Sequence, residues 1–388
     1  MWKITGKRAN FINIQMSQFT PTEHSEPSRV RTGFEKVMAH RTQPPFAYPA
    51  EQDGKILEVD AEAGLAKIQY SDGGLYVVTY GNEYSRNGGG GFYVEQRVVL
   101  NNFKTGDRFK RGDIIAYNRD FFTADVFSKQ VIANLGHHIN TVVIEGADTM
   151  EDSSAISKVG SKGLTSHPVQ ARILVITPET NIHSIATVGT KVEGKDPLMI
   201  FDESPIPSSM ADADEDTMNA LKKLNRSLPK AKYAGEVVKI ESFYKDELTS
   251  MTPSLAKVIK TTSKSKKDIA EFAKGTEDTD MYIQPGKTTA TKAKGVYMDD
   301  DTVVLVFYIR QTLLMEGGDK DVFSSSLKSV ASKVLSEDLA VEDGSVVVNA
   351  KLSGMTIHNR IVESPAIQGI GNRMMEEAER QLLEMWRK

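Results

Sequence analysis

The chain of 388 residues contains no cysteine. This absence excludes disulfides, thiolate metal sites and cysteine nucleophiles. The seven histidines are scattered and show no H-E-x-x-H pair, so a structural metal is not expected. No apolar run approaches the roughly 18 residues that a membrane-spanning helix needs. The first residues also lack the apolar stretch of a secretory signal, so we expect a cytoplasmic protein.

The charge balance is slightly acidic, with 48 Lys and Arg against 52 Asp and Glu. This balance argues against a protein that binds nucleic acid through bulk charge. The charges are nevertheless uneven, because residues 219–274 hold thirteen basic side chains against six acidic ones. Residues 202–216 hold six acids and no base. The basic stretch could contact phosphates locally, although a solvated surface explains it more simply.

The pattern of apolar residues predicts a mainly β protein. Through residues 54–85, apolar and polar residues alternate between Asp-Gly, Gly-Gly and Gly-Asn pairs, as in a meander of hairpins. Residues 302–312 form the strongest predicted strand, buried on both faces. Helical spacing is confined to a helical insert within residues 254–275 and an amphipathic helix at residues 370–388. The length favours two or three domains.

Three conspicuous motifs have simpler explanations than a functional site. The four glycines at residues 88–91 precede a predicted strand, whereas a phosphate-binding loop precedes a helix. The acids at residues 212–216 lie in a Ser/Pro-rich stretch and fit a solvated loop better than a metal site. The histidine pair at residues 137–138 is interpreted as the edge of a strand rather than a general base.

Two other segments carry candidate functional residues. Glu151 and Asp152 stand together just after the predicted strand VVIEG, although adjacent acids there can also be only a turn and a helix cap. Lys320 and Lys328 follow a glycine turn at the end of the long buried strand. Lysines on tight loops are held in place, and an ammonium group suits a phosphate as a point charge.

These two segments resemble signature motifs of the β subunit of multisubunit DNA-directed RNA polymerases. Residues 318–329, GDKDVFSSSLKS, resemble the family's GDKMAGRHGNKG, with Lys320 and Lys328 at the two family lysines. Residues 149–158, TMEDSSAISK, resemble NFEDAILISE. Weaker similarities occur in the same order as in the family, at residues 13–18, 29–39, 94–116, 188–201 and 335–355. With them, the resemblance covers about residues 12–385.

The resemblance implies the fold of the hybrid-binding and flap regions. This fold is a double-psi β-barrel interrupted by a flap-like β domain, with a C-terminal helix. Residues 1–157 would form the first part of the barrel domain. Residues 158–300 would form the flap-like domain with its helical insert, and residues 301–388 the second part of the barrel and the helix.

The resemblance also implies a role in RNA synthesis by two-metal nucleotidyl transfer. Lys320 and Lys328 would contact the 3′ end of the RNA and the phosphates of the incoming nucleotide. Glu151 and Asp152 would orient water or the second Mg²⁺ from the opposite wall. His358, Arg360 and Gln18 are weaker candidates for contacts with the substrate or the RNA phosphates, suggested by their places in the matching segments.

The sequence departs from the family in ways that point to partner chains. Residues 324–327 replace the Arg-His-Gly-Asn between the family lysines, and either His358 or Arg360 falls near a family arginine. The magnesium-binding NADFDGD loop is absent, so a β′-like subunit would hold most of the Mg²⁺. The implied partners also include the remaining β fragments, the DNA template, the RNA transcript and the NTPs.

Split subunits of this kind resemble polymerases of large bacterial viruses. The resemblance therefore implies the cytoplasm of an infected bacterial host, with packaging in the virion left open. An alternative is a catalytically inactive viral scaffold or binding module that keeps the barrel, which the changed residues 324–327 slightly favour. A weaker alternative is an unrelated β-rich carbohydrate-binding or capsid protein.

Overall fold

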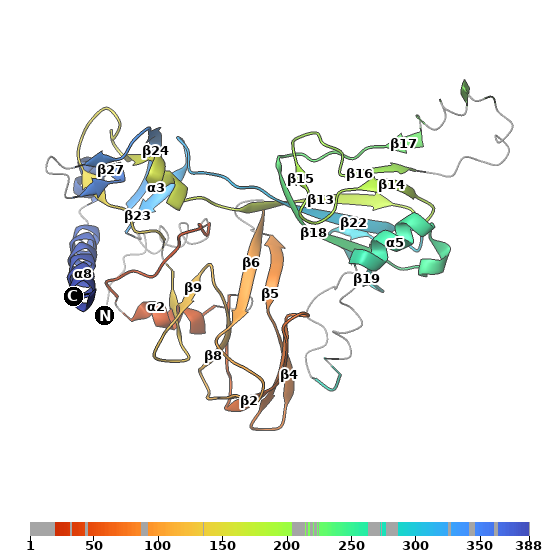
Figure 1. Cartoon of the computed structure of the whole chain (residues 1–388), viewed down its shortest axis with the longest axis horizontal. Helices are drawn as coiled ribbons and strands as arrows, with labels where there is room; N and C mark the ends of the chain where they lie inside the picture. Colours follow the sequence, from red (N-terminus) through yellow and green to blue (C-terminus); the bar gives the residue numbers. More distant parts are fainter. Residues whose placement is uncertain are drawn as a thin grey trace.

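The structure is a computed structural model, and Figure 1 shows that it is mainly β, with several sheets and few helices. It describes residues 20–31, 33–42, 46–86, 92–134, 136–203, 214, 216–217, 220, 223, 225–262, 272, 274–276, 286–324, 327–340, 346–360 and 364–387. The predictions for the glycine run at residues 88–91, for Gln18 and for most of the acidic stretch at residues 212–216 lie outside the described residues.

A nine-stranded sheet forms the largest part of the fold. Its main path runs β1-β8-β6-β13-β22-β18-β15, with β5 beside β6 and β19 beside β18. The strands are β1 (Ala47–Pro49), β5 (Gly81–Arg86), β6 (Tyr93–Leu100), β8 (Ile114–Asn118), β13 (Pro168–Ile176), β15 (Lys191–Val192), β18 (Gly235–Tyr244), β19 (Gly286–Lys287) and β22 (Val303–Arg310).

Strand β22 is the centre of this sheet, because it pairs with β13 on one side and β18 on the other. Its first seven residues are all buried, which confirms the strand predicted at residues 302–312. Val303, Leu305, Phe307 and Ile309 enter the hydrophobic core on one face. The alternate residues enter a second core on the other face, so β-branched and aromatic residues suit every position.

A four-stranded sheet, which projects downward in Figure 1, confirms the predicted hairpin meander over residues 54–79. Its order is β4-β3-β2-β7. The last part of that prediction, β5, instead pairs with β6 of the nine-stranded sheet. A three-stranded sheet and three two-stranded pairs complete the outer parts. The strands are β2 (Gly54–Asp60), β3 (Leu65–Tyr70), β4 (Leu75–Thr79) and β7 (Arg108–Phe109); β14 (Asn181–Ile185), β16 (Met199–Asp202) and β17 (Arg226–Ser227); β9 (Phe122–Ala124) with β10 (Val131–Ala133); β20 (Lys292–Ala293) with β21 (Val296–Tyr297); and β25 (Leu339–Ala340) with β26 (Val347–Val348).

A five-stranded sheet at the other end of the molecule joins distant parts of the chain. Its order is β11-β27-β12-β24-β23, an open path rather than a closed barrel among the described strands. β12 runs parallel to β24 and antiparallel to β27, while β11 runs parallel to β27. The strands are β11 (Thr141–Val143), β12 (Ser153–Ser157), β23 (Lys320–Phe323), β24 (Leu327–Leu335) and β27 (Ala350–Leu352).

The helices are few and lie outside the sheets. They are α2 (Phe34–Val37), η1 (Met38–His40), α3 (Lys158–Gly163), η3 (Leu248–Ser250), α5 (Pro253–Thr262), α7 (Gly354–Arg360) and α8 (Ser364–Arg387). Helix α5 lies in the predicted insert, and α8 confirms the predicted C-terminal helix. Among the described residues, no helix combines the length and the apolar character needed to cross a membrane.

The three predicted domains contribute differently to the two larger sheets. The five-stranded sheet takes its strands from residues 141–157 and 320–352, which belong to the first and third predicted segments. The nine-stranded sheet takes strands from all three segments. The boundaries after residues 157 and 300 therefore do not separate the strands of the nine-stranded sheet.

Candidate active site

Lys320 and Lys328 lie on the same face of the β23–β24 hairpin. In the antiparallel register, Lys320 is opposite Val330, and Val322 is opposite Lys328. Residues opposite each other project to the same face of a sheet, as do residues two apart in one strand. The two lysines are therefore diagonal neighbours, with Lys320 exposed and Lys328 half-buried.

The glycine turn before the hairpin sets this arrangement. Gly318 has φ +98°, a left-handed conformation that glycine adopts without a steric penalty. Its backbone N–H donates to the carbonyl of Ala331 at 2.7 Å, and the N–H of Ala331 donates to the carbonyl of Asp319 at 2.9 Å. The side chain of Asp319 also accepts the N–H of Glu316 at 2.9 Å. Lys320 thus enters the sheet at a position fixed by backbone bonds.

The opposite face of the hairpin belongs to the packed side of the five-stranded sheet. Leu327 and Ala331 are buried there, the latter in a core with Ile156. The hydroxyl of Ser154 donates to Asp321 Oδ2 at 2.8 Å. Burial raises the pKa of Asp321 above its ordinary value. The alternation of polar and apolar residues therefore directs the lysines outward and anchors the hairpin from behind.

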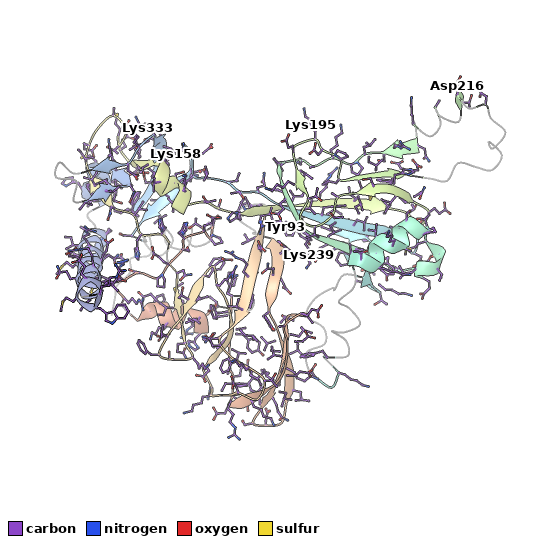
Figure 2. All side chains as sticks on the ribbon, in the orientation of Figure 1. Tyr93, Lys158, Lys195, Asp216, Lys239 and Lys333 are labelled. Carbon is purple, nitrogen blue, oxygen red and sulfur yellow. The ribbon has the colours of Figure 1, made fainter. Side chains whose placement is uncertain are left out.

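The same face continues across the sheet to two further lysines. Ala155 pairs with Lys333 on one side and with Lys351 on the other, beyond a register shift after Ser154. Because paired residues share a face, Lys320, Lys328, Lys333 and Lys351 together form what we call the lysine face. Figure 2 labels Lys333 in the part of the molecule that contains β24.

Asp148 lies over the inner part of the lysine face. Its carboxylate is 2.6 Å from Lys333 Nζ and 3.8 Å from Lys351 Nζ. The hydrogen bond from Lys333 lowers the pKa of Asp148, so this group stays ionised at neutral pH. These three residues were not predicted from the sequence. The register shift breaks the alternation between Lys328 and Lys333, and Lys351 comes from a distant strand.

Glu151 and Asp152 form an exposed turn that leads into β12. Asp152 accepts the N–H of Val330 through its carbonyl at 3.1 Å, so the turn lies beside β24. Glu151 has φ +55°, which is uncommon for a residue with a side chain. Its carbonyl accepts the hydroxyl of buried Thr356 at 2.9 Å, which helps to hold this conformation.

The structure brings the predicted lysines and acids to one small region. Lys320, Val330 and Ser153 occupy one row across three adjacent strands. At the usual strand spacing, the backbone of Lys320 is roughly 10 Å from that of Ser153, which directly follows the acid pair. Lys320 and Ser153 are more than 160 positions apart in the sequence, so only long-range pairing places them together.

The weaker candidates receive less support from their surroundings. His358 is an exposed residue of α7, the helix that contains Thr356. Glu145 caps the start of α7, where it accepts the hydroxyl of Ser353 at 2.6 Å and the N–H of Met355 at 2.8 Å. These bonds lower the pKa of Glu145. The side chain of Arg360 lies outside the described residues.

The interpretation of the histidine pair as a strand edge is wrong. His137 and His138 lie between the short strands β10 and β11, beside the N-terminal segment. Glu26 Oε1 is 3.5 Å from Nδ1 of His137 and 3.1 Å from Nδ1 of His138. Burial lowers the pKa of His137 below its ordinary value. The pair therefore contacts a segment more than 100 residues away, which local alternation does not encode.

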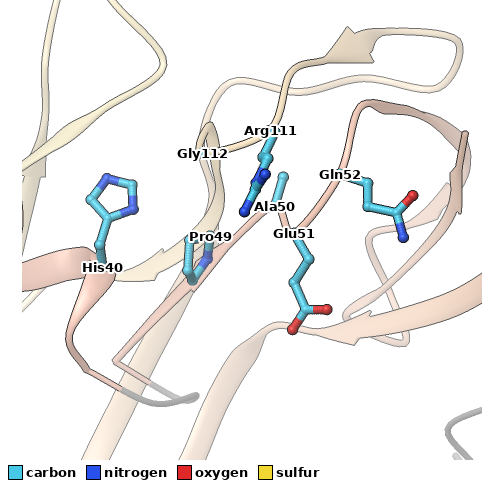
Figure 3. A pocket seen from close by; sticks show the side chains of 7 residues that line it. All are labelled: His40, Pro49, Ala50, Glu51, Gln52, Arg111 and Gly112. Atoms are coloured by element: carbon cyan, nitrogen blue, oxygen red, sulfur yellow. The ribbon is translucent and has the colours of Figure 1, made fainter.

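The described residues do not form a complete metal site. No group of three or more His, Asp or Glu side chains among them is arranged to hold a metal ion. Glu151 and Asp152 alone supply two adjacent exposed carboxylates, fewer ligands than Mg²⁺ requires. Two hollows, of about 490 and 670 Å³, are lined by other residues of the described chain, and Figure 3 shows the smaller one.

No protein-family model matches the chain, and no curated protein matches it either. Clustered ammonium groups on a rigid strand hairpin suit the phosphates of a nucleotide or a nucleic acid. The acid turn beside them can accept hydrogen bonds from hydroxyl groups or water. The arrangement supports phosphate recognition more directly than a complete catalytic reaction.

Proposed function

We propose that the chain is a fragment of a DNA-directed RNA polymerase β subunit. It would contribute to DNA-templated RNA synthesis and bind the RNA–DNA hybrid. The observation that carries this proposal is the placement of Lys320 and Lys328 on one face of a hairpin, with the turn of Glu151 and Asp152 two strands away. These four residues are the ones that the resemblance implies.

The lysines would stabilise negative charge as a phosphodiester forms. Lys320 and Lys328 would contact the 3′ end of the RNA and the phosphates of the incoming nucleotide, where charge accumulates in the transition state. Mg²⁺ supplies the activation of the attacking hydroxyl in such polymerases. A β′-like partner would have to hold these ions, because the described residues of this chain do not form the site.

The strand pairing supports, but does not complete, a double-psi β-barrel. Residues 141–157 and 320–352 interleave in one sheet, with parallel pairs between strands that are far apart in the sequence. Such mixed pairing fits a barrel that is interrupted by a flap-like insertion between its two parts. Partner chains would complete the active centre: a β′-like subunit and the remaining β fragments, acting on DNA, RNA and NTPs in an infected bacterium.

The test is primer extension by the complex that co-purifies with the tagged chain. Lys320→Ala should slow nucleotide addition by about 100-fold, the scale of losing one placed donor to the transition state. Lys195→Ala is the matched control, because Lys195 is an exposed lysine that lies well apart from Lys333 in Figure 2. Near-normal extension by Lys320→Ala would remove this lysine from the mechanism.

The second candidate is a catalytically inactive scaffold with the same fold. Two observations favour it: the four candidate residues line neither of the two hollows, and residues 324–327 lack the basic side chains of the family motif. A scaffold would assemble with its partners, yet the wild-type complex would add no nucleotide to a primer. A companion chain with an NADFDGD loop would favour the polymerase.

A further inference from the structure

The two most exposed large apolar side chains in the described part of the chain are neighbours on one hairpin. Val126 is 90% exposed and Phe127 is 96% exposed. They lie in the turn between β9 and β10, which we call the hairpin tip and define as residues 125–128. Exposed aromatic side chains are common on mobile loops, but this turn is firmly held.

Asp125 fixes the shape of the hairpin tip. Its carboxylate accepts the N–H of Phe127 at 3.3 Å and the hydroxyl of Ser128 at 2.9 Å. Lys36 of α2 donates to the same carboxylate at 2.7 Å. The bond from Lys36 is the main reason why the pKa of Asp125 falls to about 2. The tip is therefore tied to a helix nearly ninety residues earlier in the sequence.

Two residues at the base tie the hairpin to other loops. Lys129 Nζ donates to the carbonyl of Asn102 at 3.1 Å and lies 4.4 Å from the centre of the Phe103 ring. The amide of Gln130 donates to the carbonyl of Gly112 at 2.9 Å, and its oxygen is 2.8 Å from His40 Nε2. Because the hairpin is already held, binding of a partner to Phe127 would cost little loop entropy.

The 490 Å³ hollow begins at the base of this hairpin. His40 and Gly112, the two residues bonded by Gln130, both line it. Figure 3 shows that Arg111 extends into the same hollow between His40 and Gln52. Glu51 supplies the one carboxylate of the lining. The hairpin tip and the hollow thus belong to one continuous surface.

This surface is more basic than the chain as a whole. Residues 33–41, 49–53, 101–113 and 125–130 hold seven Lys and Arg against six Asp and Glu, whereas the whole chain has a net charge of −4. Five of the six acids accept backbone N–H groups; they are Glu35, Asp53, Asp107, Asp113 and Asp125. Six of the seven basic residues are exposed, so the outward charge is positive.

We propose that this surface binds single-stranded nucleic acid. Phe127 stacks on a base, while Arg111 and Lys129 contact the neighbouring phosphates. Two apolar side chains are too few for a protein interface, which buries about 800 Å² on each partner. A single strand needs only an aromatic platform with cations beside it. This site goes beyond the proposed catalytic role and lies on different residues.

The experiment measures binding of fluorescein-labelled twelve-nucleotide RNA and DNA to the full chain. Phe127→Ala should weaken binding of the preferred strand about tenfold, since stacking on one base contributes roughly 1–3 kcal/mol. Arg111→Ala should lower the slope of log affinity against log salt by about 0.7, the value for one lost phosphate contact. Preference for RNA would indicate the transcript, and preference for DNA a template strand.

Three controls separate this proposal from its alternatives. Tyr297→Ala removes another exposed aromatic side chain, 68% exposed, and Lys195→Ala another exposed cation; both should bind like the wild type. The third control places Phe127→Ala in the Lys320→Ala/Lys328→Ala background, where it should weaken binding by the same factor; this keeps the test independent of the polymerase proposal. If Phe127→Ala binds both strands as tightly as the wild type, the proposal is wrong. Loss of complex assembly with intact oligonucleotide binding would instead assign the tip to a protein partner.

Discussion

The two larger sheets use their faces in different ways. In the nine-stranded sheet, β22 is buried on both faces, and Phe307 and Tyr308 are each 0% exposed. In the five-stranded sheet, one face packs Ile156 and Ala331 while the other presents lysines. The first sheet contributes mainly packing energy. The second holds charged side chains in place on a face open to solvent.

This difference separates the residues that hold the fold from those that we propose to act. A side chain buried on both sides of a sheet is constrained by volume, so its replacement changes stability. A lysine on an open face is not constrained by packing volume, so its replacement should change stability less. Substitutions in the two sheets should therefore affect different measurements, and the following predictions test that separation.

The largest effect is expected in the centre of the nine-stranded sheet. Phe307→Ala should lower the free energy of unfolding by about 3–5 kcal/mol, because it leaves a cavity in the core that also contains Leu305 and Ile309. Val330→Ala, on the lysine face and 39% exposed, is the control and should cost less than about 1 kcal/mol. Urea unfolding measures both. Equal losses of unfolding free energy in the two variants would contradict the proposed difference between the two sheets.

An intermediate effect is expected at the buried carboxylate of Glu241. This group is 2.9 Å from Lys239 Nζ and 3.1 Å from Lys294 Nζ, and it accepts the hydroxyl of Tyr308 at 2.8 Å. Glu241→Gln should cost about 1–3 kcal/mol at neutral pH, because it leaves charged partners poorly satisfied. Unchanged stability would show that the two lysines are compensated elsewhere.

The pH dependence of this variant gives a second measurement. Burial acts to raise the pKa of Glu241, but Lys239 and Lys294 outweigh it, and the net shift is downward. The folded pKa is thus below the unfolded value of about 4.3. Its contribution is present above that pH and is lost as the pH falls through the folded pKa. The free energy of unfolding should therefore change less with pH in the acid range for Glu241→Gln than for the wild type.

The smallest effect is expected on the lysine face. Asp148→Asn removes the carboxylate that pairs with Lys333 and Lys351, both of which contact solvent. Partly exposed ion pairs contribute about 0–1 kcal/mol, so the unfolding midpoint should barely move. The control is Asp300→Asn, which makes the same change at an exposed carboxylate elsewhere in the chain. A cost above about 2 kcal/mol would mean that the lysine face is held for stability rather than for binding.

Local patterns predicted the strands but not their partners. The run of β-branched and aromatic residues in β22 identifies a buried strand without any knowledge of its neighbours. The register of β22 cannot be predicted in this way, because Ile173 pairs with Val306 across more than 130 residues. A shift by one residue would exchange the faces, and nothing local to either strand specifies the correct choice.

The candidate site was predictable to the same extent. Lys320 and Lys328 were identified from the motif around them, and the hairpin register places them on one face. Lys333 and Asp148 were missed, because a register shift interrupts the alternation and the acid comes from a separate turn. Thr356 supports the Glu151 turn from a helix some 200 residues later, a relation that no spacing in the sequence reveals.

The connection from β22 to the β23–β24 hairpin restricts where the gene can gain or lose codons. Leu313 exchanges backbone bonds with Ser166, the carbonyl of Met315 accepts the hydroxyl of Ser161, and Gly318 donates to Ala331. One codon inserted within this stretch would break these bonds or turn Lys320 to the packed side of its sheet. Related genes should accumulate insertions and deletions in outer turns and keep the distance from Arg310 to Lys320 constant.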